Sequence, residues 1–270
     1  MTELYKTGYI GLLQKKSIDG LNSRITVIKH GIFLFMQYTE KHHIRNDLPE
    51  PLFWDLIGKL YCLLHDCPNN VFRLLTDSDD KYIEKRRCIF GDSLSQVNVG
   101  EITEFIRDVE TMRIVKYHNM NMSDIFDSSR VNDVKIKLSE IAGVDGDLTK
   151  DEEWEKCVVW IRTKCNILYD FLQKMLEYIE NSATAEQRKY LCDEYISAME
   201  QYFEKNIRGI LKNILLYKYR KAEDVAISYI KKYKKEIIEQ TVMEIKQSSR
   251  LVNPYEMACQ TAEVFLEENV

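Results

Sequence analysis

Apolar residues recur at intervals of three and four along most of this chain. One clear example is the set Ile207, Ile210, Leu211, Ile214 and Leu215. Such spacing places the side chains on one face of an α-helix. The 270 residues include only ten glycines and four prolines, so few positions can end a helix or form a tight hairpin. No segment shows the alternation of a β-strand, and we therefore predict an all-α fold.

The predicted architecture is about nine antiparallel helices in a cupped layer, forming a single domain over residues 1–270. The expected helices cover residues 3–16, 21–40, 51–76 with a break near Pro68, 102–112, 152–180, 184–205, 207–220, 222–246 and 254–268. Residues 76–87 are expected to be a charged, exposed segment. Residues 119–151 are polar and acidic, and they predict a long connection with one short helix around residues 134–141.

Composition excludes several classes of function. The net charge of −5 gives no global attraction to nucleic acid. The most apolar run, GIFLFM at residues 31–36, is far too short to span a bilayer, and the first residues lack the pattern of a secretory signal. Seven irregularly spaced cysteines suit a reducing compartment. We therefore expect a cytoplasmic protein that binds neither nucleic acid nor membrane.

Three segments carry side chains that could hold a metal ion. CLLHDC at residues 62–67 lacks zinc spacing, and DGDLTKDEEWEK at 145–156 has lysines where a calcium loop needs glycine and glutamate. Asp77, Asp79 and Asp80 could bind the magnesium of an all-α diphosphate enzyme, but no second motif is correctly spaced. We expect no metal, no cofactor and no enzymatic activity, with the magnesium-dependent diphosphate enzyme as the alternative.

Four segments together resemble the 14-3-3 family in their order and spacing. They are ITEFIRDVE at 102–110, VVWIRTKCNILYDFL at 158–172, IRGILKNILLYKY at 207–219 and KAEDVAISYIKKY at 221–233. The resemblance implies a dimeric, cupped layer of nine helices that binds phosphoserine and phosphothreonine segments in a concave groove. It also implies that residues 1–45 form the dimer, where Ile25, Val27, Ile28, Ile32, Phe33 and Phe35 supply an apolar surface. A plain core role for these side chains is the alternative.

The phosphate pocket of that family departs from its pattern in this chain. With Tyr61 on the family's tyrosine, Arg73 is the only basic pocket residue retained, and Tyr169 and Asp170 replace the Arg-Tyr pair. A second register, which sets residues 74–90 against the third helix, recovers Arg86 and Arg87. Both registers stay open.

The predicted phosphate-binding residues are therefore Arg73, Arg86, Arg87 and Arg162, because arginine grips phosphate through paired, charge-assisted hydrogen bonds. Asn213 matches the asparagine that holds the backbone of the bound peptide. We predict a homodimeric adaptor for phosphorylated or acidic protein segments with an altered phosphate pocket. The other reading is a helical scaffold that has lost phosphate recognition.

Overall fold

The computed structural model describes residue 12 and residues 14–25, 34–35, 48–66, 70–90, 99–118, 120–248 and 254–269. Within these ranges the chain forms ten α-helices and two π-helical turns and contains no β-strand. The prediction of an all-α fold is therefore confirmed.

The first half of the chain forms mostly short elements, and the second half forms the long helices. In chain order they are α2 (Lys15–Ile25), α3 (Pro49–Tyr61), η2 (Cys62–Asp66), α4 (Asn70–Thr76), α5 (Asp80–Phe90), α6 (Val99–Tyr117), α7 (Ile125–Ala142), α8 (Asp151–Asn181), α9 (Ala185–Asn213), η4 (Ile214–Lys218), α10 (Glu223–Gln247) and α11 (Pro254–Asn269). The break expected near Pro68 falls at residues 67–69, outside the described residues; η2 follows α3 directly, and α4 begins at Asn70.

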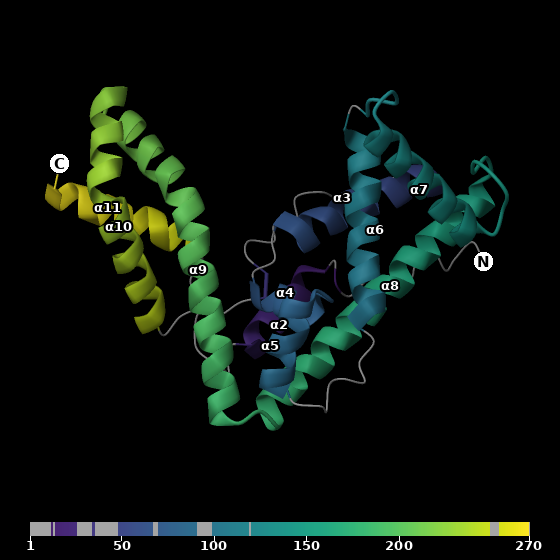
Figure 1. The fold of residues 1–270 in the computed structure, drawn as a ribbon, viewed down its shortest axis with the longest axis horizontal. Coiled ribbons are helices and arrows are strands. Elements are labelled where there is room, and N and C mark those ends of the chain that lie inside the picture. Colours follow the sequence, from purple (N-terminus) through teal and green to yellow (C-terminus); the bar gives the residue numbers. More distant parts are fainter. Residues whose placement is uncertain are drawn as a thin grey trace.

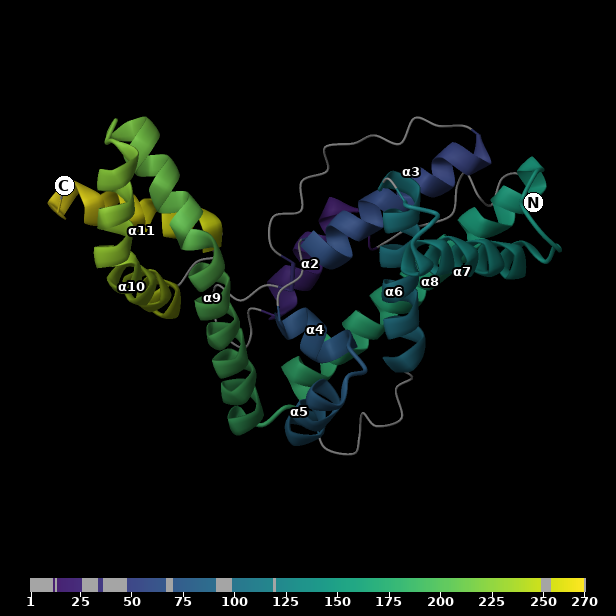
Figure 2. The ribbon, with the colours of Figure 1, turned by 45° about the horizontal axis from the view of Figure 1, so that its top comes forward.

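The two longest helices, α8 and α9, diverge from a short turn at residues 182–184 (Figures 1 and 2). Helices α2, α3, α6 and α7 pack with α8 and make the N-terminal limb, whereas α10 and α11 pack on α9 and make the C-terminal limb. Helices α4 and α5 form a corner between the limbs and both contact α9. The corner therefore joins the two halves of the molecule.

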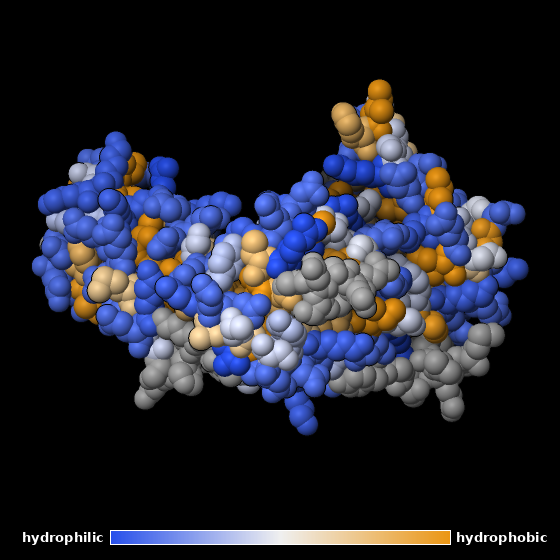
Figure 3. Space-filling model, turned by 60° about the horizontal axis from the view of Figure 1, so that its bottom comes forward, coloured by the Kyte–Doolittle hydropathy of each residue, from blue (hydrophilic) through white to orange (hydrophobic). Residues whose placement is uncertain are grey.

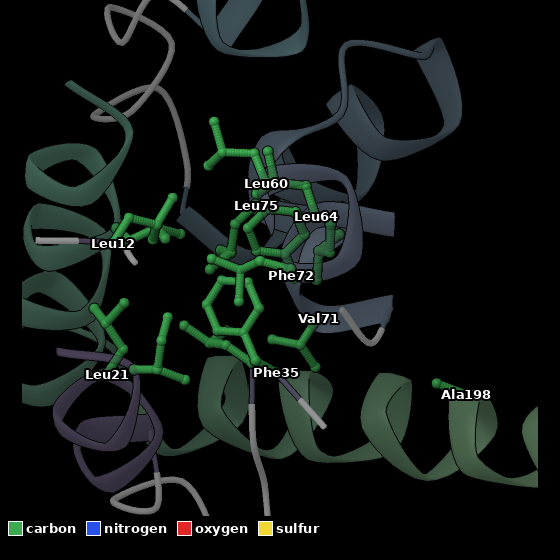
Figure 4. Close-up of a cluster of buried hydrophobic side chains, with 14 of the residues drawn as sticks. Leu12, Leu21, Phe35, Leu60, Leu64, Val71, Phe72, Leu75 and Ala198 are labelled. Carbon is green, nitrogen blue, oxygen red and sulfur yellow. The ribbon is translucent and has the colours of Figure 1, made fainter. Parts of the chain in front are cut away.

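A buried apolar cluster fills the space around this corner (Figure 4). Leu12 and Leu21 meet Phe72 of α4 and Ala198 of α9 within it, and the rings of Phe35 and Phe72 lie 5.0 Å apart. Ile25 is also fully buried in this chain, as is Phe35. The described members of the predicted dimer surface, Ile25 and Phe35, therefore belong to the core of the chain. The other members, which lie outside the described residues, are Val27, Ile28, Ile32 and Phe33.

The connection expected at residues 119–151 is largely wrong, because α7 occupies eighteen of these residues. The Asp124 carboxylate accepts hydrogen bonds from the backbone N–H groups of Phe126 and Asp127, so it caps the start of the helix. Gly143 ends the helix in the left-handed conformation, with φ of 67°. The polar composition of residues 119–151 favoured a connection, whereas Asp124 and Gly143 are residue types that commonly begin and end a helix.

Three other expectations about the helices need correction. Residues 184–205 and 207–220 do not form two helices, because the stripe of Phe203 and Ile207 continues through α9 without a breaker. Residues 76–87 are not merely an exposed segment, because α5 buries Arg86 and, at its end, Ile89. The helix expected at 21–40 ends at residue 25 in the described part of that range; most of the helix expected at 3–16 lies outside the described residues.

Candidate functional site

A pocket of about 320 Å³ lies between η2, α4 and α6. It is lined by Leu64, His65, Phe72, Arg73, Thr76, Asp77, Asp79, Thr103, Ile106, Arg107 and Glu110. Two of its apolar residues, Leu64 and Phe72, belong to the buried cluster around the corner (Figure 4). The pocket thus has an apolar floor that is continuous with the core and a rim of charged side chains.

Threonine hydroxyls hold the two walls of the pocket together. The Thr103 hydroxyl of α6 lies 2.8 Å from the backbone carbonyl oxygen of Thr76 and 2.9 Å from that of Val99, and its one proton can donate to either. Thr76 in turn donates to the carbonyl of Phe72 at 3.0 Å. Both threonines are buried, so these bonds satisfy polar groups that would otherwise be costly to bury.

An aromatic stack forms the end of the pocket next to α3. The His65 ring lies against the Tyr61 ring at 4.9 Å, and its Nε2 lies 3.3 Å from the carbonyl oxygen of Ile106. The Arg113 guanidinium lies over the Tyr61 ring at 5.5 Å and over the Tyr117 ring at 4.2 Å. These cation–π contacts order the surface between α3 and α6.

Two guanidinium groups and three carboxylates surround the pocket. Arg73 is exposed, and no described residue pairs with it. Arg107 lies 3.5 Å from Asp79, with both side chains more than half exposed. Asp77 and Glu110 complete the set. The rim can therefore contact an anion through Arg73, but its carboxylates oppose a doubly charged phosphate.

Arg86, one of the predicted phosphate donors, binds the protein's own backbone. Its side chain is 8% exposed, and its Nη1 donates to the carbonyls of Leu74 and Asp77 at 2.8 and 2.5 Å. Burial lowers the pKa of the guanidinium, although Asp77 acts in the opposite direction. Arg86 therefore closes the end of α4 by satisfying carbonyls that the helix leaves open.

The other predicted residues do not gather at this pocket. Arg162 is buried on α8, where desolvation lowers its pKa. Arg87 is exposed on α5 but does not line the pocket. Asn213 is exposed at the last turn of α9, in the other limb. Of the five predicted residues, only Arg73 lines the pocket.

The aspartates proposed for a magnesium enzyme lie at the start of α5. The Asp77 carboxylate accepts a hydrogen bond from the backbone N–H of Asp79 at 3.0 Å, and Asp79 faces Arg107. Asp80 is the first residue of the helix. Among the described residues, no group of three or more histidine, cysteine, aspartate or glutamate side chains is placed to hold a metal ion.

Sequence reasoning missed four polar residues of the pocket, which are Thr76, Thr103, Arg107 and Glu110, and it considered His65 only as a metal ligand. The positions 103, 106, 107 and 110 repeat at helical spacing, so they form one face of α6. That spacing could have indicated a polar face of α6, but the prediction for this helix considered only its apolar face.

No protein-family model matches this chain, and the comparisons with curated proteins and with solved structures also find no match. Among the helices that the structure describes, none combines the length and the apolar character needed to cross a membrane.

Proposed function

We propose that the protein is a non-enzymatic helical adaptor that binds an extended, acidic or phosphorylated segment of a partner protein at the pocket between η2, α4 and α6. One observation carries the proposal. The exposed Arg73 guanidinium, without a partner among the described residues, stands at the rim of a pocket with an apolar floor. Such a site suits a segment that combines an apolar side chain with a nearby anion.

The size of the pocket supports binding of a side chain and its neighbours. A volume of about 320 Å³ is at the lower end of ordinary ligand sites. Leu64, Phe72 and Ile106 offer apolar contact, and Arg73 offers up to five N–H donors. A hydrogen bond to a charged group contributes about 1.5–3 kcal/mol, so one arginine can orient a segment but cannot alone hold it tightly.

A scaffold without phosphate recognition is the second candidate, and the three carboxylates of the rim favour it. Asp77, Asp79 and Glu110 would repel the second charge of a phosphate more strongly than the single charge of a carboxylate. Dimerisation through residues 1–45 and a cytoplasmic location stay predictions.

The first experiment is fluorescence polarisation with a library of phosphoserine and phosphothreonine peptides and unphosphorylated copies. We expect binding of acidic and phosphorylated peptides that Arg73→Glu weakens at least tenfold. Arg87→Glu is the matched control, because Arg87 is equally exposed but lies outside the pocket. Circular dichroism would show that both variants keep the helical fold.

Two results separate the candidates. Tighter binding of phosphorylated copies that depends on Arg73 supports the phosphopeptide adaptor. Equal binding of both forms, still lost in Arg73→Glu, supports the scaffold. If no peptide binds, or if Arg73→Glu and Arg87→Glu bind like the unaltered protein, this pocket is not the site.

A further inference from the structure

The far end of the C-terminal limb is strongly basic. Residues 205–222, which we call the basic tip, contain six basic residues and no acidic residue: Lys205, Arg208, Lys212, Lys218, Arg220 and Lys221. Lys212 pairs with Glu223, and Lys218 pairs with Glu263. No ion-pair partner for the other four lies among the described residues, so this surface carries uncompensated positive charge.

The basic tip also exposes an aromatic ring and holds a strained backbone. Tyr217 is 79% exposed. Arg220 has φ of 50°, in the left-handed region where glycine is favoured. The backbone N–H of Lys221 bonds to the carbonyl of Leu215 at 2.9 Å and so closes the helix end. A long basic side chain thus occupies a position where glycine would be less strained, which points to a role for that side chain.

The opposite end of the molecule carries net negative charge and exposed apolar side chains. Residues 120–155, which we call the acidic end, contain ten acidic residues and four basic ones, a net charge of −6. Ile125 is 81% exposed and Phe126 is 76% exposed at the start of α7. Asp133 lies two turns beyond Phe126 and shares its helix face.

These apolar side chains project from the surface. Figure 3 shows a prominent apolar protrusion at the side of the molecule where the α6–α7 turn lies. Arg130 lies one turn beyond Phe126 and pairs with Asp127. Apolar side chains this exposed are typical of a contact surface rather than of an ordinary solvated helix.

The two surfaces lie toward opposite ends of the longest dimension of the molecule. Figures 1 and 2 place the turn between α9 and α10 at one end and α7 with the α7–α8 connection at the other. One copy cannot bring its own two ends together while α8 and α9 diverge. The charges and the exposed side chains can be matched only by another molecule.

We propose that the basic tip of one molecule binds the acidic end of a second copy, in a head-to-tail contact. Tyr217 and Arg220 of one copy face Phe126 and Asp133 of the next. Such an interface joins different surfaces of the two copies, so it can continue into a chain of molecules. Because much of the attraction is between exposed charges, salt weakens it.

Sedimentation velocity over a concentration series would test the contact at about 0.05 M and about 0.5 M salt, between which the screening length falls several-fold. We expect association that grows with concentration at low salt and is at least tenfold weaker at high salt. Two variants then reverse the charges. One carries Arg208→Glu and Arg220→Glu, and the other carries Asp133→Lys and Asp145→Lys.

Each variant alone should weaken the low-salt association, because the net charge of the basic tip falls from +6 to +2 in the first variant and that of the acidic end from −6 to −2 in the second. An equimolar mixture should recover it, because the unaltered basic tip of the second variant then meets the unaltered acidic end of the first. The matched control carries Lys174→Glu and Lys189→Glu, two exposed positions near the α8–α9 turn, and should associate like the unaltered protein. Circular dichroism would confirm that every variant keeps its helices.

A monomer at every concentration in low salt would overturn the proposal. A dimer that resists salt and both charge reversals would overturn it too, because the contact would then lie elsewhere. Failure of the mixture to associate, with both variants folded, would show that the two surfaces do not meet. Peptide binding at the pocket is a separate measurement, and Arg73→Glu should leave the association unchanged.

Discussion

The two limbs of this protein differ in how deeply the ion pairs between their helices are buried. In the C-terminal limb, α9 and η4 bury an aliphatic stripe composed of Ile207, Ile210, Leu211, Ile214 and Leu215. In the N-terminal limb, charged side chains also connect the helices. Lys137 of α7 lies 2.7 Å from Glu104 and 3.0 Å from Asp108 of α6, and Lys164 of α8 lies 2.6 Å from Glu101. The C-terminal limb also has ion pairs between its helices, but their lysines, Lys212, Lys218 and Lys234, are 32–44% exposed, against 24–27% for Lys137 and Lys164. Exposed pairs contribute little, so apolar burial dominates at the C-terminal seam.

This difference predicts different responses to pH. Apolar burial does not depend on protonation, whereas the ion pairs of α6, α7 and α8 require ionised carboxylates. It also explains why the helices of the C-terminal limb were easier to predict from the sequence. A stripe at helical spacing is visible in sequence, but a pairing between Lys137 and Asp108 requires knowledge of which helices are neighbours.

The largest effect is expected from Leu211→Ala. Leu211 is 1% exposed, and removal of a buried leucine costs about 2–5 kcal/mol through lost burial and the remaining cavity. We expect the free energy of unfolding to fall by about 3 kcal/mol in urea titrations. The loss should be the same at neutral and acid pH. Tyr217→Ala, at an exposed position of the same limb, should change it by less than about 0.5 kcal/mol.

A smaller loss is expected from Lys137→Met, and it should depend on pH. Lys137 and Asp108 are both about one quarter exposed, so loss of their pairing should cost about 1–2 kcal/mol at neutral pH. The hydrogen bond from Lys137 lowers the pKa of Glu104 below its ordinary value of 4.5. Glu104 therefore stabilises the fold above that value, and this contribution disappears as the pH falls through the lowered pKa.

Asp108 also makes the stability difference between the unaltered protein and Lys137→Met smaller at acid pH. Burial raises the pKa of Asp108 above its ordinary value of 3.8, while Lys137 partly offsets the rise. In Lys137→Met the pKa should rise further, so the variant pays a larger penalty for ionised Asp108 and regains stability as Asp108 is protonated. Urea titrations from pH 7 to about pH 3 should show the two proteins converging. A constant difference across this range would contradict the role given to the ion pairs.

The smallest effects concern two residues with positive φ, one in each limb. Arg220→Gly should raise the free energy of unfolding by about 1 kcal/mol, because glycine adopts φ of 50° without steric strain. Gly143→Ala should lower it by about 1 kcal/mol, because its φ is 67°. Thermal unfolding in high salt would separate these backbone effects from those of charge. If Arg220→Gly and Gly143→Ala changed the free energy of unfolding in the same direction, the steric explanation of both effects would be wrong.

Much of the fold could be predicted, and the failures have physical causes. The all-α class followed from apolar spacing and few glycines and prolines. Helix α7 was predicted only in part, as a short helix around residues 134–141, because its inward face contains few buried residues, among them Val134 and Leu138, between many polar ones. The join of two predicted helices into α9 was missed because only tertiary packing shows that the stripe continues through residue 206.

The candidate site was predicted much less completely. Of the predicted phosphate-binding arginines, Arg73 lines the pocket, whereas Arg86 and Arg162 are buried away from it. Sequence cannot distinguish an arginine that faces a ligand from one that binds carbonyls such as that of Leu74. His65 and Arg107 come from elements separated in sequence, and only the packing of η2 against α6 brings them to one pocket.

The corner formed by α4 and α5 contacts the long helix α9 close to the point where it leaves α8. Helix α9 has 29 residues and is about 44 Å long, so a change of about 5° where it leaves α8 moves its far end by about 4 Å. The corner contacts α9 near that pivot, where Lys85 of α5 lies 2.6 Å from Glu194. Thr76, at the end of α4, belongs to the corner and also lines the pocket. Any rotation of α9 that the corner imposed near this pivot would therefore be largest at the distant end of the C-terminal limb.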